Sequence, residues 1–203
     1  MTERRPLGRP AAGAIVAILA ALALAADQFV KHLTIENLPP GQPVPVFGEF
    51  LQLIFVRNSG AAFSLGKDVT WVFTIALAVV ACVIVWKTLA VRSRLWAVVL
   101  GALLGGVLGN LTDRLFREPG FPMGHVVDMI SMPWMMPAIF NVADIFIVTG
   151  MISVALLIVI GLRLDGTREQ RAKDRRPEDG ASSFPARDGA AGGSQTSTDR
   201  PDL

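Results

Sequence analysis

The chain has 203 residues but no tyrosine, one cysteine and two histidines, and this removes several common catalytic designs. The single Cys82 excludes an internal disulfide and a cysteine-rich metal site. His32 and His125 lie far apart, whereas the helix of a zinc protease needs the pattern His-Glu-x-x-His. The Gly-x-Ser-x-Gly turn of serine hydrolases and the glycine-rich phosphate loop are missing as well. We therefore expect no metal, no cofactor and no nucleic-acid partner.

Apolar residues are abundant instead, because they make up 52% of the chain and gather in long runs. A membrane-spanning helix needs about 20 consecutive, mostly apolar residues. We expect four such helices, at residues 11–33, 69–86, 95–112 and 138–162. The sequence therefore predicts an all-α integral membrane protein.

The first apolar run has a second interpretation. Residues 1–10 are basic and the run contains small residues, a pattern that is also typical of a cleavable secretory signal. Its uncharged part, residues 11–26, extends only about 24 Å as a helix, short of a roughly 30 Å hydrocarbon core. Extension to Leu33 gives enough length and brings Asp27 and Lys31 to the membrane boundary, where their spacing favours an interfacial ion pair. We favour a retained span.

The distribution of charge predicts the topology. Four spans place both termini on one side of the membrane, and that side carries fourteen of the nineteen lysines and arginines. The positive-inside rule assigns it to the cytoplasm. The basic segment 1–10 is then cytoplasmic, and so is the tail 163–203, whose polar composition predicts disorder. The tail is either a solvated segment or, through its basic first half, a contact for anionic lipid. The loops 34–68 and 113–137 face outward.

The first outward loop contains a strand-like sequence. Residues 47–57 are rich in aromatic and β-branched side chains with partial alternation, which predicts one or two short strands outside the membrane. The segment 61–65 is short, apolar and interfacial. In the third span, Gly101, Gly105 and Gly109 recur at every fourth position and form a stripe that allows a neighbouring helix to approach closely.

Two acids indicate the chemistry. Asp144 is the only charged residue in the run 138–162, and a helix beginning at residue 138 places it about 9 Å inside the membrane end. An ionisable group within a span costs roughly 2.5–3.5 kcal/mol or more, so a functional role is the first hypothesis. Asp128 lies in the mostly apolar segment 126–130, which approaches the same face. Two close carboxylates do not both ionise easily, so one can act as acid and the other as base in hydrolysis. A capping or loop role for Asp128 and a structural ion pair for Asp144 stay open.

Other polar residues are spaced to assist these acids. Asn141 precedes Asp144 by three residues and can orient an acid or a substrate carbonyl, or form an interhelical hydrogen bond. Asn110, Asp113 and Arg114 share one helical face at the outer end of the third span. Arg114 can hold a backbone carbonyl or a lipid headgroup, although its spacing favours a simple ion pair with Asp113.

Five short motifs follow one another among these spans. They are DQFVK at 27–31, NSGAAFS at 58–64, GNLTDR at 109–114, VVD at 126–128 and FNVAD at 140–144. In this order they resemble the bacterial lipoprotein signal peptidases, or signal peptidase II. The resemblance covers about residues 11–162. Each motif alone is weakly specific, whereas five in order are highly specific.

The resemblance implies an aspartic endopeptidase of the bacterial cytoplasmic membrane that cuts signal peptides from prolipoproteins just before a diacylglyceryl-modified cysteine. It assigns Asp128 and Asp144 as the catalytic pair. It assigns substrate binding or support of the pair to Asn58, Asn110, Arg114 and Asn141, and structural support to Asp27, Lys31 and Asp113. It also implies that the 47–57 strands form a small extracytoplasmic sheet that holds the substrate, and that 61–65 is a short surface helix. The expected partners are prolipoproteins and membrane lipids, and a monomer suffices.

Two other classes compete with this interpretation. A small transporter or proton-relay subunit also carries acids within the membrane, but transporters usually show internal repeats with interrupted helices, and this sequence does not. A non-enzymatic membrane scaffold is supported only by the glycine stripe.

Overall fold

The computed structural model describes residues 7–60 and 70–168. Four helices in this part of the chain are long and apolar enough to cross a membrane: α1 (Arg9–Asn37), α2 (Thr70–Thr88), α3 (Arg94–Phe116) and α4 (Val142–Val159). A three-stranded sheet is formed by β1 (Val44–Phe47), β2 (Leu51–Asn58) and β3 (Val126–Ser131). The predicted combination of four spans and a small sheet is therefore present. The segment 61–65 and the tail beyond residue 168 lie outside the described residues.

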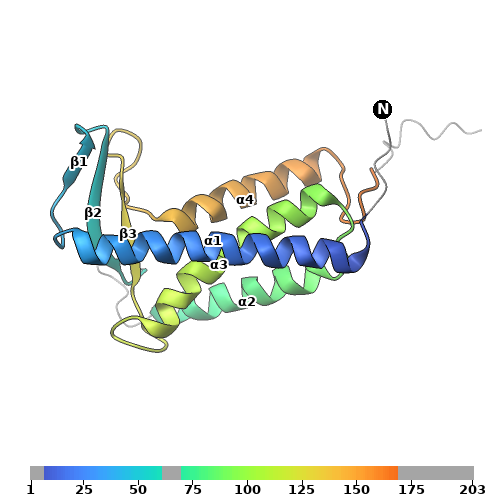
Figure 1. Cartoon of the computed structure of the whole chain (residues 1–203), viewed down its shortest axis with the longest axis horizontal. Helices are drawn as coiled ribbons and strands as arrows, with labels where there is room; N and C mark the ends of the chain where they lie inside the picture. Colours follow the sequence, from blue (N-terminus) through green and yellow to red (C-terminus); the bar gives the residue numbers. More distant parts are fainter. Residues whose placement is uncertain (1–6, 61–69, 169–203) are drawn as a thin grey trace, which may run out of the picture. The chain divides into compact units, whose positions relative to one another are not determined.

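Helix α3 is the centre of the helical part (Figure 1). In the most apolar 18-residue stretch of α3, 61% of the residues are buried. In the corresponding stretches of the other three helices the buried share is only 17–22%. The outward faces of α1, α2 and α4 instead expose large apolar side chains such as Leu22, Val79 and Ile152. This distribution is the one expected of helices that surround a central helix and present apolar surface to lipid.

The glycine stripe of α3 allows the close approach of α1, as predicted. A Cβ on Gly101 would lie 3.0 Å from the Val16 carbonyl oxygen, and one on Gly105 would lie 2.5 Å from the Ala23 Cβ. On a neighbouring face of α3, a Cβ on Gly106 would meet the Ala143 carbonyl oxygen of α4 at 2.6 Å. Glycine at these positions therefore sets how closely α1 and α4 lie against the central helix.

The sheet lies at the end of the helices where α1 finishes (Figure 1). Its strands are antiparallel in the order β1-β2-β3, with Val56 opposite Asp128 and Asn58 opposite Val126. Phe55, Val127 and Met129 form a small buried cluster with apolar residues at the end of α1. Since side chains alternate along a strand, Val127 and Met129 occupy one face of β3 while Asp128 occupies the other.

Several elements differ from the sequence expectation, and the spans predicted to end at residues 33 and 112 continue to Asn37 in α1 and Phe116 in α3. Helix α4 begins at Val142 and not at residue 138, because Asn141 caps it. Strand β3 comes from the loop between α3 and α4, in which no strand was predicted. Residues 163–168, assigned to the disordered tail, form a hydrogen-bonded turn in which the Leu164 carbonyl accepts the Arg92 N–H at 2.8 Å.

The contact between α1 and α3 can be tested with Gly105→Ala. We expect a loss of about 1–3 kcal/mol in the free energy of unfolding in detergent, because the added methyl group overlaps Ala23 and the Ala20 carbonyl oxygen. The matched control is Gly13→Ala, where nothing lies within 4 Å of an added Cβ. Equal stability of the two variants would contradict the close approach.

Candidate active site

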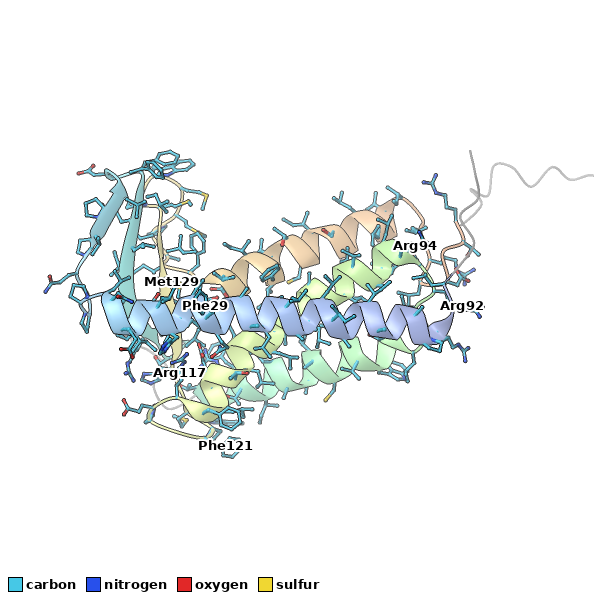
Figure 2. All side chains as sticks on the ribbon, in the orientation of Figure 1. Phe29, Arg92, Arg94, Arg117, Phe121 and Met129 are labelled. Carbon is cyan, nitrogen blue, oxygen red and sulfur yellow. The ribbon has the colours of Figure 1, made fainter. Side chains whose placement is uncertain are left out.

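The polar residues singled out from the sequence gather at the sheet end of the helices. Figure 2 shows Phe29, Arg117 and Met129 at this end, and Arg92 and Arg94 at the other. The hydrogen-bonded groups at the sheet end include all of the predicted site residues, namely Asp27, Lys31, Asn58, Asn110, Asp113, Arg114, Asp128, Asn141 and Asp144. These residues come from α1, β2, α3, β3 and the start of α4, so the site forms only when both the helical part and the sheet are assembled.

Asp128 is buried on β3, with 2% of its surface exposed. Its Oδ2 accepts a hydrogen bond from Asn58 Nδ2 at 2.8 Å, and its Oδ1 accepts one from Asn141 Nδ2 at 2.6 Å. Burial raises the pKa of Asp128 to about 6; the charge of Asp144 also raises it, while the two amide donors and Lys31 lower it. Loss of hydration therefore outweighs the hydrogen bonds, and Asp128 keeps its proton at a pH where an ordinary aspartate has lost it.

Asp144 lies in the first turn of α4, in a capping box with Asn141. The Asp144 N–H donates to Asn141 Oδ1 at 2.9 Å, and the Asn141 N–H donates to Asp144 Oδ2 at 3.2 Å. This arrangement corrects the expectation that Asp144 lies about 9 Å inside a helix starting at residue 138. The reciprocal cap satisfies N–H groups that would otherwise lack partners at the helix start, so the helix begins directly after Asn141 and its first turn presents the carboxylate.

Asn141 and Asn110 join the two acids. Asn141 Nδ2 donates both to Asp128 Oδ1 and to Asn110 Oδ1, the latter at 3.1 Å. Asn110 Nδ2 in turn donates to Asp144 Oδ1 at 2.8 Å. Asp128 and Asp144 are thus linked through two side-chain amides, one of which caps α4. Two of the interpretations offered by the sequence for Asn141 are therefore both present, because its amide contacts an acid and also forms a hydrogen bond between the start of α4 and α3.

Lys31 anchors this arrangement from α1. Its Nζ lies 2.8 Å from Asp27 Oδ2, 2.8 Å from Asp113 Oδ2 and 3.0 Å from Asn110 Oδ1, so its three N–H groups have three acceptors. The interfacial Asp27–Lys31 pair expected from the sequence is in fact fully buried. A Cβ on Gly109 would lie 2.5 Å from Asp27 Oδ2, so glycine at this position makes room for the pair.

The two acids that bind Lys31 also hold neighbouring elements in place. Asp27 Oδ1 accepts the Ala143 N–H of α4 at 2.9 Å. Asp113 Oδ2 accepts the Val127 N–H of β3 at 3.1 Å. The residues directly before Asp144 and Asp128 are therefore fixed to the same buried ion cluster.

Arg114 does not form the predicted pair with Asp113. Within residues 7–60 and 70–168, Asp113 pairs with Lys31 and with Arg117, whose Nε lies 2.6 Å from Asp113 Oδ1. The Arg114 guanidinium turns the other way: Nη1 donates to the Ser59 carbonyl at 3.3 Å, and the group lies 5.4 Å from the centre of the Phe73 ring. Spacing to Arg114 failed here because Asp113 has two other cations as partners, Lys31 from α1 and Arg117 at the end of α3.

Two residues of the network were not singled out from the sequence. Gln28 Nε2 donates to Asp113 Oδ1 at 3.0 Å and to the Gly109 carbonyl at 3.1 Å. Arg117 binds both Asp113 and Gln28 Oε1. The four-residue spacing of Asp113 and Arg117 was a usable signal for this ion pair, whereas Gln28 lies in the DQFVK motif but was given no role of its own.

Four helices that are long and apolar enough to cross a membrane, with a buried cluster of acids at one end, are typical of a multi-pass membrane protein. The family model described as Signal peptidase (SPase) II matches residues 19–160, and the chain belongs to this family of proteases. The family predicted from the five motifs is thereby confirmed. The transporter and scaffold alternatives are no longer supported.

Individual relatives and solved structures agree with this family. The lipoprotein signal peptidase of Leifsonia xyli subsp. xyli is 48% identical over 156 residues, which cover 77% of this chain and 72% of the relative. That of Rhodococcus jostii is 45% identical, covering 75% of this chain and 76% of the relative. A bacterial membrane enzyme solved at 1.9 Å is similar in fold, with a TM-score of 0.63 and 25% identity over 71% of this chain and 92% of that one.

Removal of the Lys31 charge tests the buried cluster. We expect Lys31→Met to lower the free energy of unfolding by about 3–5 kcal/mol, because it leaves Asp27 and Asp113 buried without their shared cation. Addition of Asp27→Asn should recover part of the loss. The control is Arg57→Met, whose exposed pair with Glu118 contributes about 0–1 kcal/mol. A loss no larger than the control's would refute the anchoring role.

The raised pKa of Asp128 predicts how stability depends on pH. The folded state binds this proton more tightly than the unfolded state, so its contribution makes stability fall as the pH rises from about 4 to about 6. The loss of stability across this range is about 3 kcal/mol, because the pKa of Asp128 is about 6 in the folded state and 3.8 ordinarily. Melting curves in one detergent between these pH values should show the decline in the parent and lose it in Asp128→Asn.

The matched control is Asp165→Asn. Hydrogen bonds from the Thr167 side chain and backbone lower the pKa of this exposed carboxyl. Its contribution to stability therefore rises with pH, whereas that of Asp128 falls. Parallel pH curves for the parent and Asp128→Asn would show that Asp128 is not the titrating group.

Proposed function

We propose that this peptidase removes signal peptides from lipoprotein precursors by cleaving just before a diacylglyceryl-modified cysteine, with Asp128 and Asp144 as the catalytic pair. The relatives named lipoprotein signal peptidase support the substrate class. The observation that carries the assignment of the pair is the link from Asp128 through Asn141 and Asn110 to Asp144. It holds two acids from different elements around the same pair of amides, at the end of a membrane-spanning bundle.

The two acids divide the chemistry. Because its pKa is raised to about 6, Asp128 holds the shared proton, and Asp144 acts as the base. Asp144 takes a proton from water, the water oxygen attacks the scissile carbonyl carbon, and Asp128 gives its proton to the carbonyl oxygen. One hydroxyl of the resulting diol then returns a proton to Asp128 while Asp144 protonates the departing cysteine nitrogen. The C–N bond breaks, and both acids regain their starting states.

The surrounding residues position the pair and the substrate. Asn58 and Asn141 orient the carboxyl of Asp128 through its two oxygens. Arg114 Nε is buried and has no hydrogen-bond partner in the described part of the chain, so it is available to a substrate carbonyl. Asp27, Lys31 and Asp113 provide structural support without contacting substrate. One chain supplies all of these groups, so a monomer suffices.

The position of the site in the membrane follows from charge and from the substrate. The described residues 7–15, 82–97 and 155–168, at the end opposite the site, contain six lysines or arginines and one acid. By the positive-inside rule, this charge supports a cytoplasmic location for that end and both termini. The site and the sheet then lie at the outer leaflet of the bacterial cytoplasmic membrane. Burial of two acyl chains in the bilayer is favourable by about 0.8 kcal/mol per CH₂. The modified cysteine therefore stays in the bilayer and reaches the site laterally, at the depth of the site.

The assignment is tested by incubating the purified protein with a diacylglyceryl-modified precursor and separating the products by mass. Asp128→Asn and Asp144→Asn should each reduce cleavage at least about a hundredfold, since loss of general acid or base catalysis removes about 10²–10⁴ in rate. Asp165→Asn makes the same chemical change in an exposed turn and should cleave like the parent. Parent-like cleavage by either site variant would remove that aspartate from the mechanism.

A further inference from the structure

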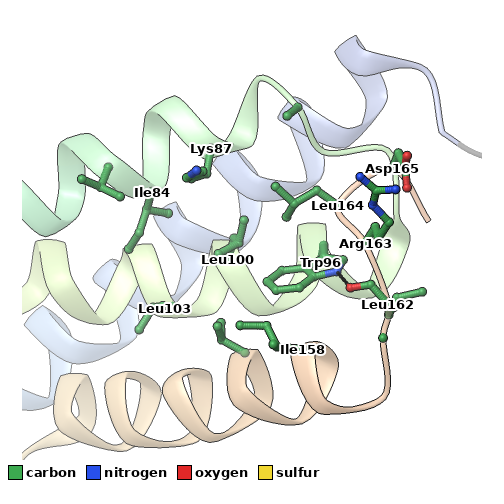
Figure 3. A pocket seen from close by; sticks show the side chains of 14 residues that line it. Ile84, Lys87, Trp96, Leu100, Leu103, Ile158, Leu162, Arg163, Leu164 and Asp165 are labelled. Atoms are coloured by element: carbon green, nitrogen blue, oxygen red, sulfur yellow. Dashed lines mark hydrogen bonds between the residues drawn. The ribbon is translucent and has the colours of Figure 1, made fainter. Parts of the chain in front are cut away.

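An apolar groove lies at the other end of the helices from the catalytic pair. It is lined by α2, α3 and α4, and Figure 3 shows Ile84 of α2, Trp96, Leu100 and Leu103 of α3 and Ile158 of α4 around it. Its volume is about 680 Å³, which is within the roughly 300–1,000 Å³ of ordinary small-molecule sites. The groove is therefore large enough for part of a lipid chain.

The turn after α4 closes one end of the groove and is held in place. Trp96 Nε1 donates to the Leu162 carbonyl at 3.0 Å, and Leu164 accepts the N–H groups of Arg92 and Ser93. The residues between Gly161 and Asp165 that line the groove are thus tied to α3 and to the segment before it. This end is a formed feature of the fold.

The rim of the groove carries two cations. Lys87, in the last turn of α2, and Arg163, just after α4, both line it and are both exposed (Figure 3). Asp165 also lines the rim, beside Arg163. One of its carboxylate oxygens accepts both the Thr167 N–H at 2.9 Å and the Thr167 hydroxyl at 2.7 Å. These bonds hold the acid in its own turn, where its charge offsets part of the charge of Arg163 and leaves the rim with one net positive charge. The rim therefore combines apolar walls with positive charge.

We propose that the groove binds an anionic phospholipid, with an acyl chain between α2 and α4 and the phosphate between Lys87 and Arg163. Basic pockets between membrane helices on the cytoplasmic side suit anionic headgroups, and the excess of cations at this end agrees. The competing occupant is the membrane segment of a precursor. Signal peptides begin with a positively charged region, which Lys87 and Arg163 repel, so charge complementarity favours the lipid. The site is independent of the residues assigned to catalysis.

Native mass spectrometry of the full chain in detergent, with equal phosphatidylglycerol and phosphatidylethanolamine of the same acyl chains, tests the headgroup contact. The parent should retain phosphatidylglycerol preferentially. Lys87→Gln and Arg163→Gln should each reduce this preference about fivefold, and the double variant about twenty-five-fold, because each cation near an anionic headgroup contributes about 1 kcal/mol.

Arg92→Gln and Arg94→Gln are the matched controls, since they remove the same charge at the same end without lining the groove. They should keep the parent's preference. An equal loss in these controls would show a general surface attraction and overturn the proposal, and so would an unchanged preference in the double variant.

The groove itself is tested with Val83→Trp, which fills it from α2, and with Val85→Trp, an exposed position on the same helix that does not line it. Only Val83→Trp should release the lipid. A photoreactive p-benzoylphenylalanine at position 83 then identifies the occupant in membranes that contain a precursor. Capture of phosphatidylglycerol supports the proposal, and capture of the precursor's membrane segment overturns it. Neither result depends on whether Asp128 and Asp144 perform the cleavage.

Discussion

The side-chain amide of Asn141 is the contact on which the rest of the site depends. It donates to Asp128, its oxygen caps α4, and its second acceptor is the Asn110 oxygen. One residue therefore fixes where the last helix begins, where Asp144 points, and how far β3 lies from the helix ends. Two carboxylates beside a bilayer repel each other and lose hydration, and neutral amides placed between them supply hydrogen bonds without adding charge.

A second group of charges, paired among themselves, lies beside the catalytic candidates. Lys31 and Arg117 offset Asp27 and Asp113, and each of these two acids also accepts a backbone N–H next to a catalytic candidate. The buried cluster thus connects α1 and α3 to the start of α4 and to β3. Burial of such a cluster costs free energy, because its charges lose hydration. In return, its directed contacts keep the sheet and the helices in register, which apolar packing alone does not do.

Much of this arrangement could be predicted from the sequence, because a membrane imposes simple rules on length and composition. The four spans follow from apolar runs, and the stripe of Gly101, Gly105 and Gly109 predicted a close helix contact. Strand β3 was missed because it is buried and pairs with β2, about seventy residues earlier, a distance that local patterns do not report. The Asp113–Arg114 pair was wrong because Lys31 reaches Asp113 from another helix. The start of α4 was placed too early because hydropathy marks an apolar run and does not recognise the cap at its beginning.

The central claim is that Asp144 lies close enough to Asp128 for its charge to raise the pKa of Asp128. It is tested most directly by carboxyl-carbon NMR of Asp128 across the pH range, in the parent and in a variant in which Asp144 is replaced by asparagine. The account predicts a midpoint near pH 6 in the parent and a lower midpoint in the variant, still above the ordinary value because burial remains. An unchanged midpoint would mean that the two carboxylates do not sense each other, and would contradict the account.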